Sequence, residues 1–453
     1  MLYTLTILET LFDSLADTVF SKRGLEGAAY VLCGVSRTAN ETRLLARTLV
    51  PVKDEHYLVR EPTRLSIASE SYASVAKQAK LAGEAVLFVH SHPTGFDTFS
   101  EQDDREEPKL LSFIRGRAPG LPHAALVLWS KRDLTGRVWQ HGTTWEPLTR
   151  TRVIGRRFRV VEHVKSDIPI PEFFDRQVRA FGPEIQALLS RLYVGVIGAG
   201  GTGSATIEQL ARLGVGTISV FDGDTLADTN VTRIHGSGLA QEGEKKVEVQ
   251  HAHVKAIGLG TKLIPYPKHI NDEETAKALR ECEFLFGCTD NQGPRSTLVR
   301  LSHRYLIPVF DTAVKIDSKD GVIRGITGRV TTLLPEEACL FCRGRIDSGT
   351  IRAENLPPEQ RERELIEGYA PELGGEEPAV VTFTTAVAAQ AVSELLHRLT
   401  GFMGEERVSS ETLLLFGENR LRSNRDKPNE ACMCQDRTAW GKGDTKNFLG
   451  KTW

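Results

Sequence analysis

Short apolar runs rich in β-branched residues recur in the first third of the chain. GAAYVLCGV (27–35) and EAVLFVH (84–90) predict buried strands, and SIASESYASVAKQAKLAGE (66–84) between them has helical character. HAALVLWSKRDLTGRVWQ (123–140) predicts a strand, a turn and a second strand. We therefore expect residues 1–150 to form one α/β domain.

The pattern changes after residue 150. VVEHVKSDIPIPEFF (160–174) mixes charged residues with two prolines and has no clear period. Such a stretch is typical of a linker between domains. We place the linker at 151–172 and a second domain at 173–436. The remaining residues, 437–453, are expected to be a weakly ordered tail.

The second domain opens with RLYVGVIGAGGTGSATIEQLARLGVGTISVFDGD (191–224), which predicts a strand, a glycine-rich turn, a helix and a second strand ending in acidic residues. Further buried strands are predicted at CEFLFGCTDN (282–291) and RYLIPVFDTA (304–313), and an apolar helix at 380–401. This order predicts a doubly wound, mostly parallel sheet with polar residues at the carboxyl ends of its strands.

Composition and charge narrow the classes of partner. The chain has 453 residues, 40% hydrophobic and 26% charged, with a formal net charge of -2. This composition is that of a globular protein, and a near-neutral chain has no overall field to attract nucleic acid or an acidic membrane. Residues 1–20 show no basic leader before an apolar stretch, and no apolar run approaches the roughly 20 residues of a membrane-spanning helix. We expect a cytoplasmic protein that binds neither nucleic acid nor membranes.

The spacing of the seven cysteines is more informative than their number. Cys339 and Cys342 form a C-x-x-C pair, and Cys432 and Cys434 form a C-x-C pair. Two close pairs of thiols are the arrangement of a structural tetrahedral zinc site. The alternative is that these are unpaired buried cysteines. The three others are scattered: Cys33, Cys282 and Cys288.

The glycine-rich turn has the pattern G-x-G-G-x-G, directly between a strand and a helix. Glycines there let the backbone approach a phosphate, which the N–H groups of the helix start then bind. Asp222 ends the second strand, where a carboxylate can hold a ribose hydroxyl. A nicotinamide or flavin dehydrogenase is one interpretation. The four glycines are Gly198, Gly200, Gly201 and Gly203.

The residues around this turn favour a triphosphate over a dinucleotide. A triphosphate under attack needs cations on its oxygens and a carboxylate to hold magnesium, whereas a dehydrogenase needs neither beyond the turn. Each residue alone could be an ordinary charged loop residue, but the combination predicts ATP and Mg²⁺ binding. The set is Asp224, Asn230, Arg233, Lys246, Asp290 and Asn291.

The segment FVHSHPTGFDTFSEQDD (88–104) permits two interpretations. Ser100 followed by an acidic residue three positions later is typical of a helix start, so the segment could be only a polar cap. Alternation along a strand also points His90 and His92 to the same side, as a metal site requires. Asp103 can supply a third ligand, with Asp104 as an alternative.

The segment from Phe174 to Cys434 resembles the ThiF/MoeB superfamily, the adenylyltransferases ancestral to ubiquitin-activating enzymes. The matching pieces are FDRQV, GAGGTGS, DGDTLADTNVTR, EKKVE, GCTDN, ACLFC and ACMC. The resemblance implies that Asp222 binds ribose and that Asp290 is the carboxylate associated with magnesium. It implies three triphosphate contacts: Asn230, Arg233 and Lys246.

This resemblance also implies a reaction and partners. Such enzymes join the C-terminal glycine carboxylate of a ubiquitin-fold protein to AMP and release pyrophosphate. The family pattern makes Arg176 an arginine that reaches the nucleotide of the neighbouring protomer, which implies a homodimer. Many relatives carry a catalytic cysteine in the stretch equivalent to 366–387, which here contains none. Cys288 is the best remaining thiol, but we expect it to pack at a strand end and the acyl group to pass to a thiol on another, ubiquitin-conjugating-like protein.

The first domain, over residues 1–145, resembles the JAMM zinc isopeptidases, which have a cytidine-deaminase-like α/β fold. The matching pattern is Glu26, then His90-x-His92-Pro, six residues, and Ser100-x-x-Asp103. By that pattern the two histidines and Asp103 bind a catalytic zinc. Glu26 is the general acid and base, and Ser100 donates a hydrogen bond to the oxyanion.

Together the two resemblances imply a fused enzyme of a prokaryotic ubiquitin-like conjugation system. One half activates the C-terminus of a ubiquitin-like protein, and the other cleaves a peptide or isopeptide bond after it. A role in phage defence rests on family analogy alone. The alternative is the activation and trimming of a sulfur-carrier protein. A third hypothesis is that one half only holds the partner without catalysis.

Overall fold

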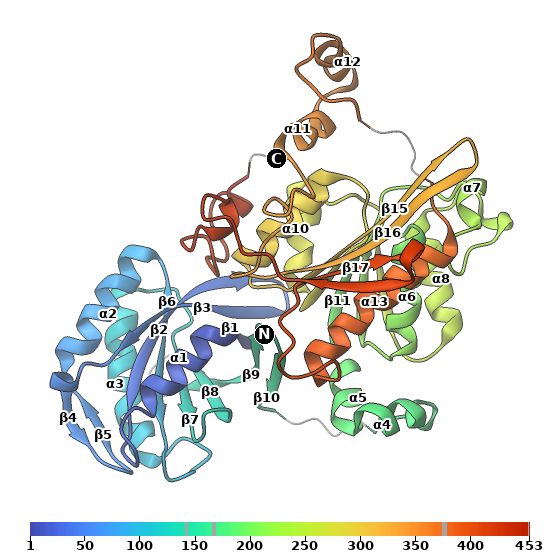
Figure 1. Ribbon diagram of the computed structural model, residues 1–453. Helices are drawn as coiled ribbons and strands as arrows, with labels where there is room; N and C mark the ends of the chain where they lie inside the picture. Colours follow the sequence, from blue (N-terminus) through green and yellow to red (C-terminus); the bar gives the residue numbers. More distant parts are fainter. Residues whose placement is uncertain (141–143, 165–168, 374–377, 452) are drawn as a thin grey trace. The chain divides into compact units, whose positions relative to one another are not determined.

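The chain folds into two units, each built around its own eight-stranded sheet. The computed structural model describes residues 1–140, 144–164, 169–373, 378–451 and 453. The first unit holds the N-terminal residues as far as 164 together with 304–306 and 438–446, and the second holds the rest. Figure 1 labels many of the helices and strands of both units.

The sheet of the first unit closes on itself. Its order is β1-β3-β2-β6-β7-β8-β9-β10, and an additional parallel pairing of β1 with β9 joins the two sides. A separate two-stranded hairpin is formed by β4 and β5. The bounds are β1 Leu2–Leu8, β2 Ala28–Arg37, β3 Glu41–Pro51, β4 Tyr57–Arg60, β5 Leu65–Ile67, β6 Ala85–Ser91, β7 Ala124–Leu128, β8 Leu134–Trp139, β9 Trp145–Ile154 and β10 Phe158–Glu162.

Helices cover both faces of this sheet because its strands are apolar on both sides. Alternate residues of β6 enter different cores: Leu87 packs in the core that contains α1, and Phe88 in the core that contains α2 and α3. Strand alternation therefore places His90 on the α2 and α3 side. The helices are α1 Glu9–Val19, α2 Ser69–Ala82 and α3 Glu101–Arg117. The strands and the helix predicted between 27 and 140 are confirmed.

The linker predicted at 151–172 is wrong in its first half. Residues up to 162 form β9 and β10, so the first domain extends well beyond residue 150. The mixed charges and two prolines of residues 160–174 had suggested a linker. Arg152 is in fact buried, and its guanidinium donates to the Glu41 carboxylate over 3.0 Å. Pairing of this kind lets a strand with alternating charges enter a closed sheet.

The second unit is a doubly wound sheet of order β13-β12-β11-β14-β15-β16-β17-β18, as predicted. Its pairings are parallel from β13 to β15 and antiparallel from β15 to β18. β11 and β14 are central neighbours, so the loops after them lie together at one edge of the sheet. The bounds are β11 Tyr193–Ile197, β12 Thr217–Phe221, β13 Lys262–Tyr266, β14 Phe284–Gly287, β15 Val309–Lys319, β16 Val322–Leu333, β17 Glu411–Leu415 and β18 Arg420–Asn424.

The helix predicted at 380–401 is confirmed as α13, which packs beside α6, as Figure 1 shows. A Cβ built on Gly201 of α6 would lie 3.2 Å from the Thr384 hydroxyl of α13, which leaves little room there. The helices are α4 Asp175–Phe181, α5 Pro183–Leu189, α6 Gly201–Arg212, α7 Asp228–Val231, α8 Lys246–Ile257, α9 Glu273–Ala278, α10 Gln292–Arg304, α11 Ser348–Asn355, α12 Pro358–Ile366 and α13 Val381–Thr400.

The prediction of a weakly ordered tail at 437–453 is also wrong. Residues 438–446 belong to the first unit, where Gly443 pairs in parallel with Val35 at the end of β2. A Cβ on Gly34 would lie 2.0 Å from a carbonyl oxygen of this segment, so the approach depends on a residue without a side chain. The contacts combine backbone pairing with polar side chains, such as Asp444, which accepts the Arg37 N–H, and Lys442, which donates to Glu84. Such contacts leave no hydrophobic period to recognise in the sequence.

Among the described residues, no helix is both long enough and apolar enough to cross a membrane.

Candidate functional site

Two histidines at the end of β6 form the centre of the first site. His90 lies within β6 and His92 directly follows it, and both are buried. Their Nε2 atoms are 3.2 Å apart. The other ring nitrogen of His92, Nδ1, lies 3.0 Å from the carbonyl oxygen of Phe96. That contact favours an N–H at Nδ1 and a free electron pair at Nε2, which is the form that binds a metal.

A helix start brings Asp103 to the two rings. Ser100 is the N-cap of α3, its hydroxyl accepts the Asp103 N–H, and its own N–H donates to Asp103 Oδ2 over 2.6 Å. Asp103 Oδ1 lies 3.1 Å from His90 Nε2, and Oδ2 lies 3.4 Å from His92 Nε2. The helix-cap and metal-site interpretations of this segment are therefore compatible, because the capping box holds the Asp103 carboxylate beside the two histidine rings.

The three side chains fit a zinc ion. Zinc bonds of about 2.0–2.2 Å to nitrogen and oxygen place tetrahedral ligands about 3.3–3.6 Å apart. The separations of 3.1–3.4 Å between the ligand atoms of His90, His92 and Asp103 are close to this. Burial alone would raise the pKa of Asp103, but the charge of His90 and hydrogen bonds from both rings lower it below its usual value. Three ligands leave a fourth position for water, as in catalytic zinc sites.

Glu26 reaches this site from a distant part of the chain. Ala28 of β2 pairs with His90 of β6 in antiparallel register, so the residue two positions before Ala28 lies beside the end of β6. Burial raises the pKa of Glu26 above its usual value, and the charges of His90 and His92 partly oppose this shift. A buried carboxylate with a raised pKa beside a metal site is suited to proton transfer.

Asp104, the alternative ligand, is not directed at the two histidines. Its Oδ1 accepts a hydrogen bond of 2.5 Å from the guanidinium of Arg137. It is not part of the group of ligand atoms formed by the two histidines and Asp103.

The glycine-rich turn of the second unit forms one wall of a second site. Gly198 has a φ of +96°, and a Cβ on Gly203 would lie 1.9 Å from the Gly198 carbonyl oxygen. Both positions therefore require glycine. Asp222 organises the turn, because its Oδ2 accepts the Ala199 N–H at 2.7 Å. Its Oδ1 accepts the Asp224 N–H at 2.9 Å, and each carboxylate oxygen retains a lone pair for a further donor.

A cavity of about 270 Å³ opens over this turn at the carboxyl ends of β11, β12 and β14. This is the edge at which doubly wound sheets bind nucleotides. The predicted residues that line it are Gly198, Gly200, Asp222, Asp224, Lys246, Asp290 and Asn291.

A cation and an anion face each other in this cavity. Lys246 begins α8, and its Nζ donates to Asp224 Oδ2 over 2.8 Å. His269 lies 3.4 Å from the same carboxylate. The hydrogen bond from His269 lowers the pKa of Asp224 well below its usual value, and Lys246 adds to this shift. Lys246 thus has an ion-pair partner on the wall of the same cavity.

Some predicted residues do not line the cavity. Gly201 and Gly203 belong to the glycine-rich turn but do not line the cavity. Arg176 lies exposed on α4. Asn230 and Arg233 lie on or beside α7, where Arg233 donates to the Thr229 carbonyl. Six further lining residues were not predicted from the sequence. Each lies at or just after the end of a strand of the sheet, or near the start of a helix: Ile197, Phe221, His269, Ile270, Thr289 and Pro294.

Cys288 lies against the same cavity without being activated. Burial raises the pKa of its thiol to about 11, and hydrogen bonds with Thr312 and Thr206 only partly oppose this. Such a thiol is protonated near neutral pH and is a poor nucleophile. The geometry agrees with the expectation that Cys288 packs at a strand end.

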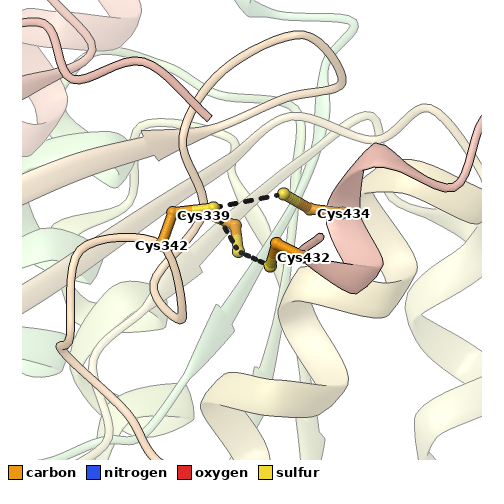
Figure 2. A group of neighbouring side chains, drawn as sticks. All are labelled: Cys339, Cys342, Cys432 and Cys434. Atoms are coloured by element: carbon orange, nitrogen blue, oxygen red, sulfur yellow. Dashed lines mark hydrogen bonds between the residues drawn. The ribbon is translucent and has the colours of Figure 1, made fainter. Parts of the chain in front are cut away.

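The four paired cysteines converge on one point. Figure 2 shows Cys339, Cys342, Cys432 and Cys434 with their sulfur atoms turned toward one another. The Sγ separations are 3.8, 3.6 and 3.5 Å for the pairs that make contact. Zinc–sulfur bonds of about 2.3 Å place tetrahedral sulfurs about 3.8 Å apart, so this cluster fits a structural zinc. The N–H of Asn429 and the amide of Gln435 donate to two of the sulfurs, as expected around thiolates.

Family comparisons agree with this division of the chain. Residues 174–435 match the model of the ThiF family. The chain belongs to the ThiF family. Residues 8–141 match the model of the prokaryotic homologues of the JAB domain, so the two resemblances found in the sequence are confirmed.

Curated relatives are similar to part of this ThiF-family chain. It is 28% identical over 177 residues to the molybdopterin-synthase adenylyltransferase of Escherichia coli (strain K12), covering 38% of this chain and 68% of the relative. It is 28% identical over 161 residues to the SAMP-activating enzyme E1 of Haloferax volcanii, covering 36% of this chain and 56% of the relative. The chain thus spans about half the length of the archaeal relative. A solved structure of E. coli MccB with ATP has a TM-score of 0.46 and 15% identity, covering 59% of this chain and 76% of that one.

Proposed function

We propose that this chain is a bifunctional enzyme that activates the C-terminal glycine of a ubiquitin-like protein and also cleaves the bond that follows that glycine. The observation that carries the proposal is the presence in one ThiF-family chain of a nucleotide-type cavity and a His-His-Asp site with a buried glutamate. Both chemistries act on the same glycine of the partner: adenylation uses its free carboxylate, and cleavage hydrolyses the amide bond formed by its carbonyl. Since it consumes ATP, we place the enzyme in the cytoplasm.

In the adenylation half, the backbone of the glycine-rich turn would cradle the phosphates of ATP. The partner's terminal carboxylate attacks the α-phosphorus, a carboxyl–phosphate bond forms, and pyrophosphate leaves. Lys246 of the cavity wall would neutralise charge that develops on the phosphate oxygens, and the family pattern assigns triphosphate contacts to Asn230 and Arg233 beside the cavity. Asp290 would hold Mg²⁺, and Asp222 would hold the ribose, with its carboxylate already oriented by two backbone amides.

In the cleavage half, His90, His92 and Asp103 would hold zinc, which supplies Lewis-acid chemistry and lowers the pKa of a water molecule to near 7. Glu26 would take the proton of the attacking water and pass it to the leaving amine, so that the C–N bond breaks and a carboxyl forms. The Ser100 hydroxyl would donate a hydrogen bond to the developing oxyanion. We propose that the activated partner passes to a thiol on another protein, because the Cys288 thiol of this chain is protonated near neutral pH.

A second candidate is the activation of a sulfur carrier, which the similarity to a molybdopterin-synthase adenylyltransferase favours. In that case the adenylate becomes a thiocarboxylate and the protease trims the carrier. A ubiquitin-conjugating protein encoded beside this gene would favour conjugation, whereas a sulfurtransferase would favour the alternative. If one half only bound the partner, its motifs would not need to be intact, and in both halves they are.

The decisive experiment offers one candidate partner to both sites. A small ubiquitin-fold protein from the neighbouring genes is prepared in two forms, one ending in glycine and one extended beyond it. We expect the first to stimulate exchange of pyrophosphate into ATP and the second to be cleaved after the glycine. The extended form should not support exchange until it is cleaved. The proposal would be overturned if no such neighbouring protein, in either form, supported pyrophosphate exchange or was cleaved.

We also propose that two chains pair and that Arg176 acts in trans. Arg176 is exposed on α4 and does not line the cavity of its own chain, so it is available to a second copy. Mixing inactive Arg176→Ala protein with an inactive Lys246→Ala protein should restore part of the exchange activity, because one site in the mixed dimer has both residues. Exposed Arg179→Ala on the same helix serves as the control and should stay active alone. An absence of complementation would contradict an arginine supplied in trans.

A further inference from the structure

One buried polar atom at the first site has no hydrogen-bond partner within the part of the chain that the structure describes. The Nε2 atoms of His90 and His92 face Asp103, and His92 Nδ1 contacts the Phe96 carbonyl. His90 Nδ1, by contrast, is buried with no hydrogen-bond partner among the described residues. A histidine that binds a metal through Nε2 carries its proton on Nδ1, and such N–H groups are nearly always donated to an acceptor. The site is therefore missing an acceptor for His90.

A second buried atom without a partner lies on the same helix as Asp103. Glu107 follows Asp103 by one helical turn on α3 and is 3% exposed. Its Oε2 accepts hydrogen bonds from Trp139 Nε1 at 3.0 Å and Arg137 Nε at 2.9 Å. Its Oε1 has no partner among the described residues. A carboxylate oxygen in that state can accept one or two further hydrogen bonds.

Arg137 holds this glutamate in place. It is 2% exposed, pairs with the Glu107 carboxylate at 2.8 Å and lies over the ring of Phe99 at 3.8 Å. A buried charge of this kind costs several kcal/mol of desolvation unless it is well paired, in proteins generally. The cation, its aromatic neighbours and the tryptophan N–H together fix one oxygen of Glu107 and leave the other free.

Both unpartnered groups belong to residues that line one cavity. His90 and Glu107 contribute to the walls of a cavity of about 140 Å³ that also reaches Asp103. A water molecule needs about 10–15 Å³ of such space and two or more polar partners. The cavity therefore has room for a water molecule beside these two side chains. Both unpartnered atoms are covered in this conformation, so a bridging water would require a small rotation of one side chain.

We propose that Glu107, oriented by Arg137, is a positioning residue for the metal site. It accepts the Nδ1 proton of His90 through one water molecule, which keeps Nε2 free for zinc and fixes the orientation of the ring. This inference rests on the proposed zinc site of the cleavage half. It assigns a role to two buried charged residues that the motif of Glu26, the two histidines, Ser100 and Asp103 leaves unexplained.

The test measures the zinc affinity of the full-length protein by competition with a chelator. The His90→Ala protein is the reference, because it should bind zinc only at the four-cysteine site. We expect Glu107→Met to weaken the N-terminal site by about 10–100-fold. Glu107→Gln, which retains a carbonyl acceptor, should lose less. The visible spectrum of the Co²⁺-substituted protein should change with Glu107→Met. Glu106→Met is the matched control, since Glu106 lines the same cavity but pairs with Lys109.

A single change could act by leaving Arg137 buried without a partner. The double variant Glu107→Met with Arg137→Met removes both charges, which is often neutral for stability. It should fold with a thermal midpoint near that of the wild type and still bind zinc weakly. If this folded variant bound zinc with wild-type affinity and gave an unchanged Co²⁺ spectrum, the role of Glu107 would be overturned but the proposed metal site would stand. A wild-type protein that binds no more zinc than His90→Ala would overturn the proposed metal site and the inference together.

Discussion

Replacing Lys246 with alanine is expected to slow partner-dependent exchange of pyrophosphate into ATP by about 10²–10³-fold, the usual effect of losing one preorganised charge-stabilising group. The Lys246 ammonium lies in the nucleotide cavity at the first position of α8 and is held by Asp224 at 2.8 Å. Charge moves onto the phosphate oxygens as pyrophosphate leaves, so this cation acts mainly in the transition state. The measurement is the exchange rate of radiolabelled pyrophosphate at saturating partner.

Two companion variants separate this effect from a loss of folding. Lys255→Ala removes an exposed lysine from the last turn of the same helix and should leave exchange unchanged. Asp290→Ala should abolish exchange, because Asp290 lines the cavity where magnesium would sit. If Lys246→Ala or Asp290→Ala exchanges pyrophosphate at the wild-type rate, the cavity is not the adenylation site. None of these changes should alter cleavage of the extended partner.

The second large effect is expected in the cleavage half, where two variants should fail for different reasons. His90→Ala removes a metal ligand, so the protein should contain one zinc ion per chain where the wild type contains two, and cleavage should stop. Glu26→Gln leaves the three ligands intact and should retain both zinc ions. It should nonetheless slow cleavage by about 10²–10⁴-fold, the usual contribution of a general acid and base. Elemental analysis and a cleavage assay on the extended partner measure both.

The contrast between these variants makes the result specific. Both should exchange pyrophosphate normally with the mature partner, which shows that the second unit is intact. Asp104→Ala is the matched control for a carboxylate beside the site, because Asp104 faces Arg137 and should not bind the metal. Cleavage by His90→Ala protein would exclude zinc-dependent hydrolysis at this site. Loss of zinc from Glu26→Gln would instead mean that Glu26 is a ligand and not a proton carrier.

The parts predicted well from the sequence are those whose geometry is local. The glycine-rich turn follows from four glycines within six residues, two of which have no space for a side chain. The metal trio follows from strand alternation at His90 and His92 and from a helix start at Ser100. Each of these depends on backbone geometry over fewer than fifteen residues, which neighbouring residues in the sequence determine.

The parts that were missed depend on which distant segments meet. β9 and β10 looked like a linker because some of their charged residues find partners far away in the sequence, as Arg152 does with Glu41. Residues 438–446 looked unstructured because they join the first unit through backbone pairing and polar side chains, with no apolar period. His269 was overlooked because it is an isolated histidine in the sequence, although it lies beside Asp224 in the fold.

The sequence by itself determined which reactive side chains are present and which strand ends, turns and helix starts they lie on. Its motifs also identified the two families. Only the tertiary structure decided which groups face one another. The pairing of Ala28 with His90 brings Glu26 to the metal trio, and packing of α3 against β8 sets Glu107 beside Arg137. The reason is that spacing along a strand or helix is a short-range property of the backbone. Strand register and core packing instead depend on burial and ion pairing over the whole unit.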